Sequence, residues 1–372
     1  MIKTDFQLCH ASFLIGRIKK LKNLTKNHIL TEKIAFLTSL SLLFSYIETI
    51  LPKFTPFFKL GLANTIVISA LNFNFQSFFV LICAKTIISS LFGGTLLSPF
   101  FVISICQSFL SSFAMFFLHK LNVLTKKRFC STYGISVFGA SISSCVQILL
   151  CSFYLGKGVF VFLPPMLIFG IFSGFFTAFL NEYLKFSENM DLLISKISKM
   201  QQQPEFQKLP ESNKFFQKQK FSENHKLSNF LIFCFVILSF ATFLVKNIFV
   251  LCIFLILAFT FQIFLGKKIK LLPHVFLWFF VIFCAILVPN GEVLFKIGSL
   301  SITKGAVFSG ITKSLKLSIV ASLSLSLCSM NFTIKKSFFF TKVMEDFRFL
   351  MQIFNESDGN IFKKIKKTFE IE

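Results

Sequence analysis

Long apolar runs, each close to the length of a bilayer-spanning helix, recur along almost the whole chain. About 20 consecutive apolar residues form a helix of roughly 30 Å, which matches the hydrocarbon thickness of a membrane. The runs therefore predict an all-α, polytopic transmembrane helical bundle of about ten spans, six followed by four. The expected spans are 33–51, 57–73, 75–96, 98–118, 133–155, 160–183, 228–245, 247–266, 272–289 and 308–330.

The distribution of charge supports this interpretation. The chain is 54% hydrophobic and has a formal net charge of +23, which in a soluble protein would indicate a nucleic-acid partner. Here the lysines and arginines lie between the apolar runs, as they do in the cytoplasmic loops of membrane proteins. We expect both termini in the cytoplasm, a multi-pass protein of a bacterial cytoplasmic (inner) membrane, the lipid bilayer as a partner, and no nucleic-acid binding.

The apolar runs fall into two groups, and a polar segment rich in Gln, Lys, Ser and Pro separates them. Such a composition is typical of a linker rather than a packed domain. The expected parts are a basic cytoplasmic N-terminus (1–32), a six-helix membrane module (33–184), a cytoplasmic linker (185–227), a second membrane module (228–332) and a basic cytoplasmic tail (333–372).

Several polar residues interrupt the first two apolar runs, in the stretch "SYIETILPKFTPFFKLGLANT". A carboxylate within a membrane, here Glu48, is costly and indicates function, although hydration at the outer interface would also explain it. Lys59 can reach the headgroups from a helix end. Asn64 needs a hydrogen-bond partner inside a span, and Gly61 permits close helix packing or an irregular backbone. Together they favour the wall of a polar pocket.

Lys85 lies well inside the third apolar run, and Ser89 follows it on the same helical face. A deep lysine beside a hydroxyl suits an anionic ligand or a buried carboxylate partner such as Glu48. A structural ion pair explains the lysine equally well, and the two interpretations are compatible. A carboxylate near lysines suits a zwitterion or an anion as ligand.

Further polar and small residues occur within the later spans of the first group. Gln107 and Gln147 are explained by hydrogen bonds between helices or by ligand binding, and Gln147 is counted here among the binding residues. Gly170 and Gly174 form a GxxxG pattern, which favours close helix packing.

Motifs for catalysis and nucleotide binding are missing from the sequence. There is no GxxxxGK[ST] phosphate loop, no aspartate cluster to hold magnesium on a diphosphate, and no CxxC or Cys/His spacing for zinc. We therefore expect no enzymatic activity of this chain alone, no metal site, no cofactor and no disulfide framework.

Residues of about 31–184 resemble a bacterial membrane family labelled Gx transporter, or heptaprenyl diphosphate synthase component I. The stretches "SYIETILP", "KLGLANTIVISAL", "KTIISSLFGGTLLSP" and "YGISVFGASISSCVQILL" carry the resemblance. The family is similar to the six-helix substrate-binding components of energy-coupling-factor (ECF) transporters. The resemblance implies a solute site, for which the candidate residues are Glu48, Lys59, Asn64, Lys85, Ser89 and Gln147.

Residues of about 228–332 resemble, more weakly, the transmembrane T component of the same transporters, in "FKIGSLSITKGAVFSGITKSLKLSIVASLSLSL". Thr303, Gly310 and Lys316 occupy the places of a turn threonine, a glycine and a basic residue on a helix. The resemblance implies that the second module transmits movement from separate ABC-type ATPase subunits.

Taken together, the sequence predicts an ECF-type transporter component that binds a small solute in the first module. Two alternatives remain open. One is a membrane accessory subunit in isoprenoid or quinone metabolism that recruits a polyprenyl synthase, and the other is a membrane scaffold that transports nothing.

Overall fold

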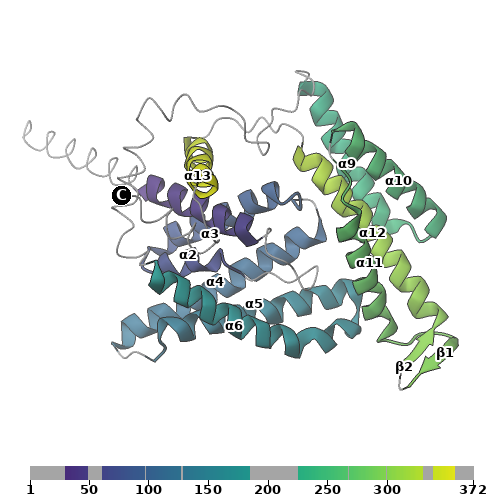
Figure 1. Cartoon of the computed structure of the whole chain (residues 1–372), viewed down its shortest axis with the longest axis horizontal. Coiled ribbons are helices and arrows are strands. Elements are labelled where there is room, and N and C mark those ends of the chain that lie inside the picture. The colour runs from purple at the N-terminus through teal and green to yellow at the C-terminus, as the bar shows by residue number, and fades with distance from the viewer. Residues whose placement is uncertain are drawn as a thin grey trace, which may run out of the picture.

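The computed structural model is almost entirely helical (Figure 1). It describes residues 30–48, 61–96, 98–126, 129–184, 225–266, 268–298, 300–329 and 338–356. A first helix, Leu30–Glu48, precedes the labelled elements. These are α2 (Asn64–Ser69), α3 (Phe75–Phe92), α4 (Pro99–Thr125), α5 (Thr132–Leu155), the 3₁₀ helix η1 (Lys157–Phe162), α6 (Leu163–Tyr183), α9 (His225–Leu244), α10 (Ile248–Phe264), α11 (Leu271–Ile286), β1 (Val293–Ile297), β2 (Leu300–Thr303), α12 (Lys304–Ser329) and α13 (Phe338–Glu356).

Six helices of the described residues are long and apolar enough to cross a membrane. Five belong to the first module and the sixth is α12, while three shorter apolar helices lie at Ile232–Leu244, Ile248–Phe264 and Leu271–Ile286. Large apolar side chains such as Phe153 (79% exposed) and Phe172 (69%) point outward, as expected where lipid rather than water is the solvent. The helical multi-pass membrane architecture is thus confirmed, while the count of ten spans stays a prediction.

The expected helix over 57–73 is wrong for the part that the structure describes. Residues 61–73 contain one short helix, α2, between turns. Gly61 has φ +69°, a left-handed conformation that glycine adopts without the penalty of a Cβ. Its carbonyl oxygen accepts a hydrogen bond from the backbone N–H of Asn64 at 2.7 Å, which closes a turn at the start of α2. The turn places polar backbone inside the bundle instead of at a membrane surface.

The helices α3 to α6 form an antiparallel series, as their side-chain contacts show. The α3–α4 pair meets at Phe78 and Phe116, with ring centroids 4.7 Å apart. The α4–α5 pair meets where the Ser111 hydroxyl donates to the Gly139 carbonyl at 2.8 Å. Hence α3 and α5 finish at the same end of the bundle, where α4 and α6 begin. We call this the covered end.

The second module packs across the covered end. One buried cluster joins the end of α5 (Cys151 and Leu155) and η1 (Val159) with α11 (Cys284) and α12 (Leu317). The apolar residues of this cluster exclude water between the two modules and so stabilise their contact.

Two further contacts show that α12 lies across the covered end instead of beside the first bundle. Lys313 of α12 donates to the carbonyl of Leu155, the last residue of α5, at 3.1 Å. Leu325 of α12 contacts Gly94, just after α3. The two α12 residues are about 18 Å apart along the helix, at 1.5 Å per residue. In Figure 1 the helices of the first module accordingly run crosswise to α9, α11 and α12.

A hairpin and a terminal helix were not anticipated from the sequence. The segment between α11 and α12 forms the antiparallel pair β1–β2. Part of the expected basic tail forms α13, whose buried face includes Val343, Phe347 and Leu350. This face joins the main core of the first module, and the Phe347 and Phe92 rings are 5.6 Å apart. The chain thus returns from the second module to pack against the first.

The crosswise packing predicts a disulfide between engineered cysteines at positions 94 and 325, with some backbone strain because Gly94 has φ +68°. A Cβ on Gly94 would lie 3.5 Å from the Cβ of Leu325, within the range that a disulfide requires. We expect the double variant Gly94→Cys with Leu325→Cys to cross-link under mild oxidation. A protease site inserted between residues 185 and 227 then allows the chain to be cut between the modules. The disulfide should keep the two halves together on a non-reducing gel after this cleavage. The single variants are the controls, and failure of the pair to cross-link would contradict this packing.

Candidate functional site

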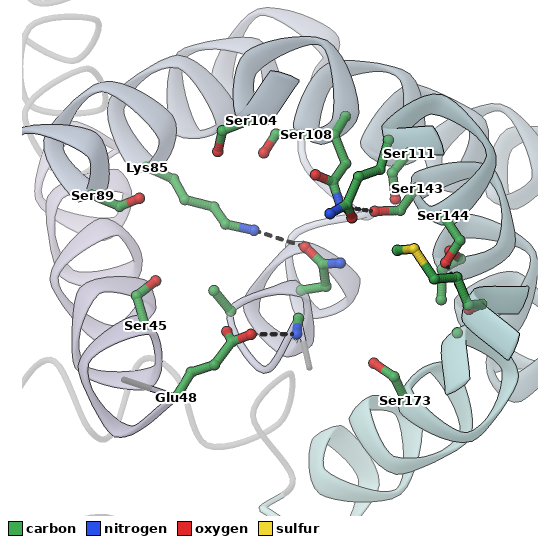
Figure 2. A pocket seen from close by; sticks show the side chains of 18 residues that line it. Ser45, Glu48, Lys85, Ser89, Ser104, Ser108, Ser111, Ser143, Ser144 and Ser173 are labelled. Atoms are coloured by element: carbon green, nitrogen blue, oxygen red, sulfur yellow. Dashed lines mark hydrogen bonds between the residues drawn. The ribbon is translucent and has the colours of Figure 1, made fainter. Parts of the chain in front are cut away.

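A polar cavity of about 90 Å³ lies inside the first bundle. It is large enough for ordered water or a small solute, and smaller than the roughly 300–1,000 Å³ of pockets for drug-sized ligands. Residues from the first helix, the 61–64 turn and α3 to α6 line it: Ser45, Glu48, Gly61, Ala63, Asn64, Lys85, Ser89, Ser104, Gln107, Ser108, Ser111, Ala140, Ser143, Ser144, Gln147, Met166, Gly170 and Ser173. Figure 2 shows these side chains around it.

Among the described residues that line the cavity, the two charged ones are both hydrogen-bonded to the turn at 61–64. A Glu48 carboxylate oxygen accepts from the Gly61 amide at 3.0 Å, and Lys85 Nζ donates to Asn64 Oδ1 at 2.9 Å. Figure 2 shows Glu48 and Lys85 reaching this turn from two different helices. Glu48 is 8% and Lys85 7% exposed. The turn therefore fixes a carboxylate and an ammonium close together in a site largely shielded from solvent.

Amide side chains form the opposite wall, between α4 and α5. Gln107 Nε2 donates to Ser143 Oγ at 2.6 Å and to Gln147 Oε1 at 3.3 Å. These contacts hold two amides at the cavity surface in fixed orientations, because each lies within hydrogen-bond reach of a neighbouring helix.

Two serine hydroxyls of the wall donate to backbone carbonyls. Ser111 Oγ donates to Gly139 O at 2.8 Å, and Ser144 Oγ lies 3.2 Å from both Ala140 O and Met166 O. A hydroxyl that donates its hydrogen in this way still has lone pairs that accept. The wall thus presents hydrogen-bond acceptors as well as the donors of Lys85.

Five of the six residues proposed from the sequence to bind solute line this cavity: Glu48, Asn64, Lys85, Ser89 and Gln147. The sixth, Lys59, lies outside the described residues. The structure thus brings together side chains up to 99 positions apart in the sequence. Their binding role is a proposal that the geometry supports.

Of the three glycines expected in helix packing, Gly170 and Gly174 lie at close approaches between helices, whereas Gly61 lies in the turn before α2. Gly61 and Gly170 also line the cavity. A Cβ on Gly170 would lie 2.7 Å from Ser144 Oγ, and one on Gly174 would lie 2.6 Å from Val137 Cα. Both contacts are between α6 and α5, so these two helices can approach this closely because neither glycine has a side chain.

Sequence reasoning missed most of the serines of the wall, and it left Gln107 outside the binding set. A signal was present in their spacing: Ser104, Gln107, Ser108 and Ser111 recur at i, i+3, i+4 and i+7, which is one face of a helix. Ser143 and Gln147 repeat the pattern on α5. A polar stripe along an otherwise apolar helix marks the face turned toward a cavity or a polar partner.

The residues named for the second module lie at its helix contacts. Thr303 Oγ1 accepts a hydrogen bond from the backbone N–H of Asn290 at 2.9 Å. This bond links the end of the hairpin to the segment that follows α11. A Cβ on Gly310 would lie 3.1 Å from Ile282 Cα, so α12 packs closely on α11 there. Lys316 Nζ donates at 2.9 Å to Phe243 O, near the end of α9. A cation is favourable at a helix C-terminus because of the helix dipole.

Metal-ligating side chains are not gathered anywhere in the part of the chain that the structure describes. No group of three or more His, Cys, Asp or Glu lies close enough together there to hold an ion. The cavity itself offers one carboxylate among neutral oxygens and a lysine, which is a poor set of ligands for a divalent cation.

In comparison with known proteins, each module matches a family model. No curated protein and no solved structure matches the chain. Residues 227–328 match a family described as a domain of unknown function (DUF8519), and the T-component resemblance of this module stays a prediction. Residues 37–184, which contain every cavity-lining residue, match the model described as heptaprenyl diphosphate synthase component I. This match over residues 37–184 confirms the family resemblance predicted for the first module.

Proposed function

We propose that the first module binds a small hydrophilic solute in its polar cavity and that the chain is a membrane transporter component. The observation that carries the proposal is the cavity itself. Burying a carboxylate, an ammonium, three amides and a ring of hydroxyls inside an apolar bundle is costly, and a structural role needs fewer of them. Candidate binding residues are Glu48, Asn64, Lys85, Ser89 and Gln147, with Lys59 as a further candidate.

Transport of the energy-coupling-factor type fits the packing of the two modules. The middle of α12 at Lys313 and its last turns at Leu325 both touch the covered end of the first bundle, so the two sets of helices do not stand upright side by side. In the proposed mechanism the first module binds solute in a bacterial cytoplasmic membrane, and its crosswise contact with the second module couples the movements of the two. The whole chain would have about ten spans. Its second module would receive movement from separate ABC-type ATPases, and the chain itself would perform no chemistry.

The family description favours a second candidate function, a membrane accessory subunit that recruits a polyprenyl synthase. In that case the helical bundle anchors the synthase at the membrane where its prenyl substrate lies. The small polar cavity is not needed for this role.

Purification of the tagged full-length protein in a gentle detergent, with mass spectrometry of bound proteins, separates the two functions. We expect ABC-type ATPase subunits to copurify. Recovery of a polyprenyl synthase without ATPases would replace the transport proposal with the accessory-subunit function. Recovery of other stable membrane partners and of neither class would indicate a scaffold.

A further inference from the structure

We infer that the cavity of the first module selects a small, non-aromatic zwitterion, a molecule with one ammonium and one carboxylate group. This inference rests on the proposed function and adds the chemical class of the solute. Four features of the cavity support it: the two opposite charges, the turn to which both are hydrogen-bonded, the neutral remainder of the wall and the small volume.

The charges that the described residues bring to the cavity are balanced. Among the described residues that line it, Glu48 contributes one negative charge and Lys85 one positive charge. A ligand with a net charge would leave an uncompensated charge in a site of low dielectric constant, which is strongly unfavourable. A ligand of zero net charge with an ionic group at each end satisfies both residues, with its ammonium at Glu48 and its carboxylate at Lys85.

The same turn positions both ionic groups. Glu48 contacts the amide of Gly61 and Lys85 contacts the side chain of Asn64, three residues later in the same turn. The left-handed conformation of Gly61 is part of this turn. Both charges are therefore held by hydrogen bonds to one short turn, which suits a compact zwitterion better than an extended one.

The rest of the wall is neutral and hydrogen-bonding. Its amides are linked to each other and to Ser143, and its serine oxygens offer acceptors. Such a wall binds the body of a small hydroxylated or amide-bearing solute, and it contributes no charge.

The wall contrasts with the rest of the chain in its lack of aromatic rings. The sequence contains 58 phenylalanines, yet no aromatic residue is among the described residues that line the cavity. A prenyl chain or a heteroaromatic ring prefers a predominantly apolar or aromatic pocket. At about 90 Å³, the cavity also has room for few heavy atoms. These features disfavour a prenyl chain and a nucleobase in this cavity.

Thermal unfolding of the purified full-length protein, with a panel of probes, tests the inference. The probes are L-serine as a small zwitterion, L-tryptophan as a large aromatic one, glycerol as a neutral polyol, lactate as an anion and farnesyl diphosphate as a prenyl ligand. We expect L-serine to raise the unfolding temperature, and the other four to have no effect at the same concentration.

Variants at the two charges make the test specific. Glu48→Gln and Lys85→Met should each weaken the L-serine response at least about tenfold in half-saturating concentration, as expected for loss of a buried charged contact. Lys120→Met is the matched control, because this lysine lies toward the opposite end of α4 over the Phe116 ring and should leave the response unchanged. Glu48→Gln keeps an oxygen that can accept from Gly61, so it provides a readout if Lys85→Met fails to fold.

The outcomes separate this inference from the proposed function. Stabilisation by lactate, glycerol or L-tryptophan in place of L-serine would overturn the zwitterion assignment and leave a solute-binding protein. No response to any probe, with ATPases still copurifying, would also overturn the assignment alone. Stabilisation by farnesyl diphosphate, with a polyprenyl synthase copurifying, would overturn both.

Discussion

Replacing Asn64 by leucine is expected to lower the free energy of unfolding of the first module by about 1.5–3 kcal/mol, the usual contribution of a hydrogen bond to a charged group. Asn64 Oδ1 accepts from Lys85 Nζ at 2.9 Å inside the bundle. Leucine removes this acceptor while the ammonium stays buried, and a buried charge that loses a partner is costly. Thermal or denaturant unfolding of the full-length protein in detergent measures the effect.

Two further variants show whether the cause is the lost contact with Lys85. Asn64→Asp keeps an oxygen acceptor at the same position and should retain most of the stability. The double variant Asn64→Leu with Lys85→Met should be more stable than Asn64→Leu alone, because the buried ammonium is gone. If Lys85→Met gave no such rescue, the two side chains would not be coupled as the structure shows.

Replacing Gly158 by valine is expected to separate the two modules. A Cβ at this position would collide with the carbonyl oxygen of Cys284 on α11, and it would lie 3.3 Å from Leu287 Cβ. The obstacle is backbone, which cannot rotate away, so either η1 or α11 must shift. Overpacking of this kind typically costs about 1–3 kcal/mol, which here falls on the contact between modules.

To measure this, a protease site is inserted between residues 185 and 227 and the chain is cut there. The first module is then captured by its tag, and the amount of second module that remains bound is measured. The unmodified interface should hold the two halves together, and Gly158→Val should release the second half. Gly134→Ala is the control, since the nearest atom to its added Cβ would be 3.6 Å away, an ordinary contact. Unchanged retention in Gly158→Val would contradict the packing of α11 on η1.

Helical architecture and a large part of the cavity could be predicted from the sequence, because hydrophobicity and charge are local signals. A lysine or glutamate deep in an apolar run is rare enough to stand out, and both Lys85 and Glu48 line the cavity. Serine is common in this chain, and each one is unremarkable alone. The cavity serines become informative only through their helical spacing, as for Ser104, Ser108 and Ser111.

Packing between distant segments had no comparable signal. The apolar pattern of α12 predicts a membrane helix, but it does not say that Lys313 caps the end of α5 and that Leu325 touches Gly94. Likewise, the lysines around α13 suggested a charged tail. The apolar face of α13, at Val343, Phe347 and Leu350, was present in the sequence. It alternates with charged residues such as Asp346 and Arg348, so the segment does not resemble a membrane span.

The central claim is that the first module holds a small polar solute between Glu48, Asn64 and Lys85. Mass spectrometry of small molecules extracted from the purified full-length protein, with Lys85→Met prepared in parallel, tests it most directly. We predict a hydrophilic compound that is stoichiometrically enriched in the wild-type protein and lost from Lys85→Met. Equal amounts of that compound in both preparations, or prenyl lipid as the enriched species in both, would contradict the claim.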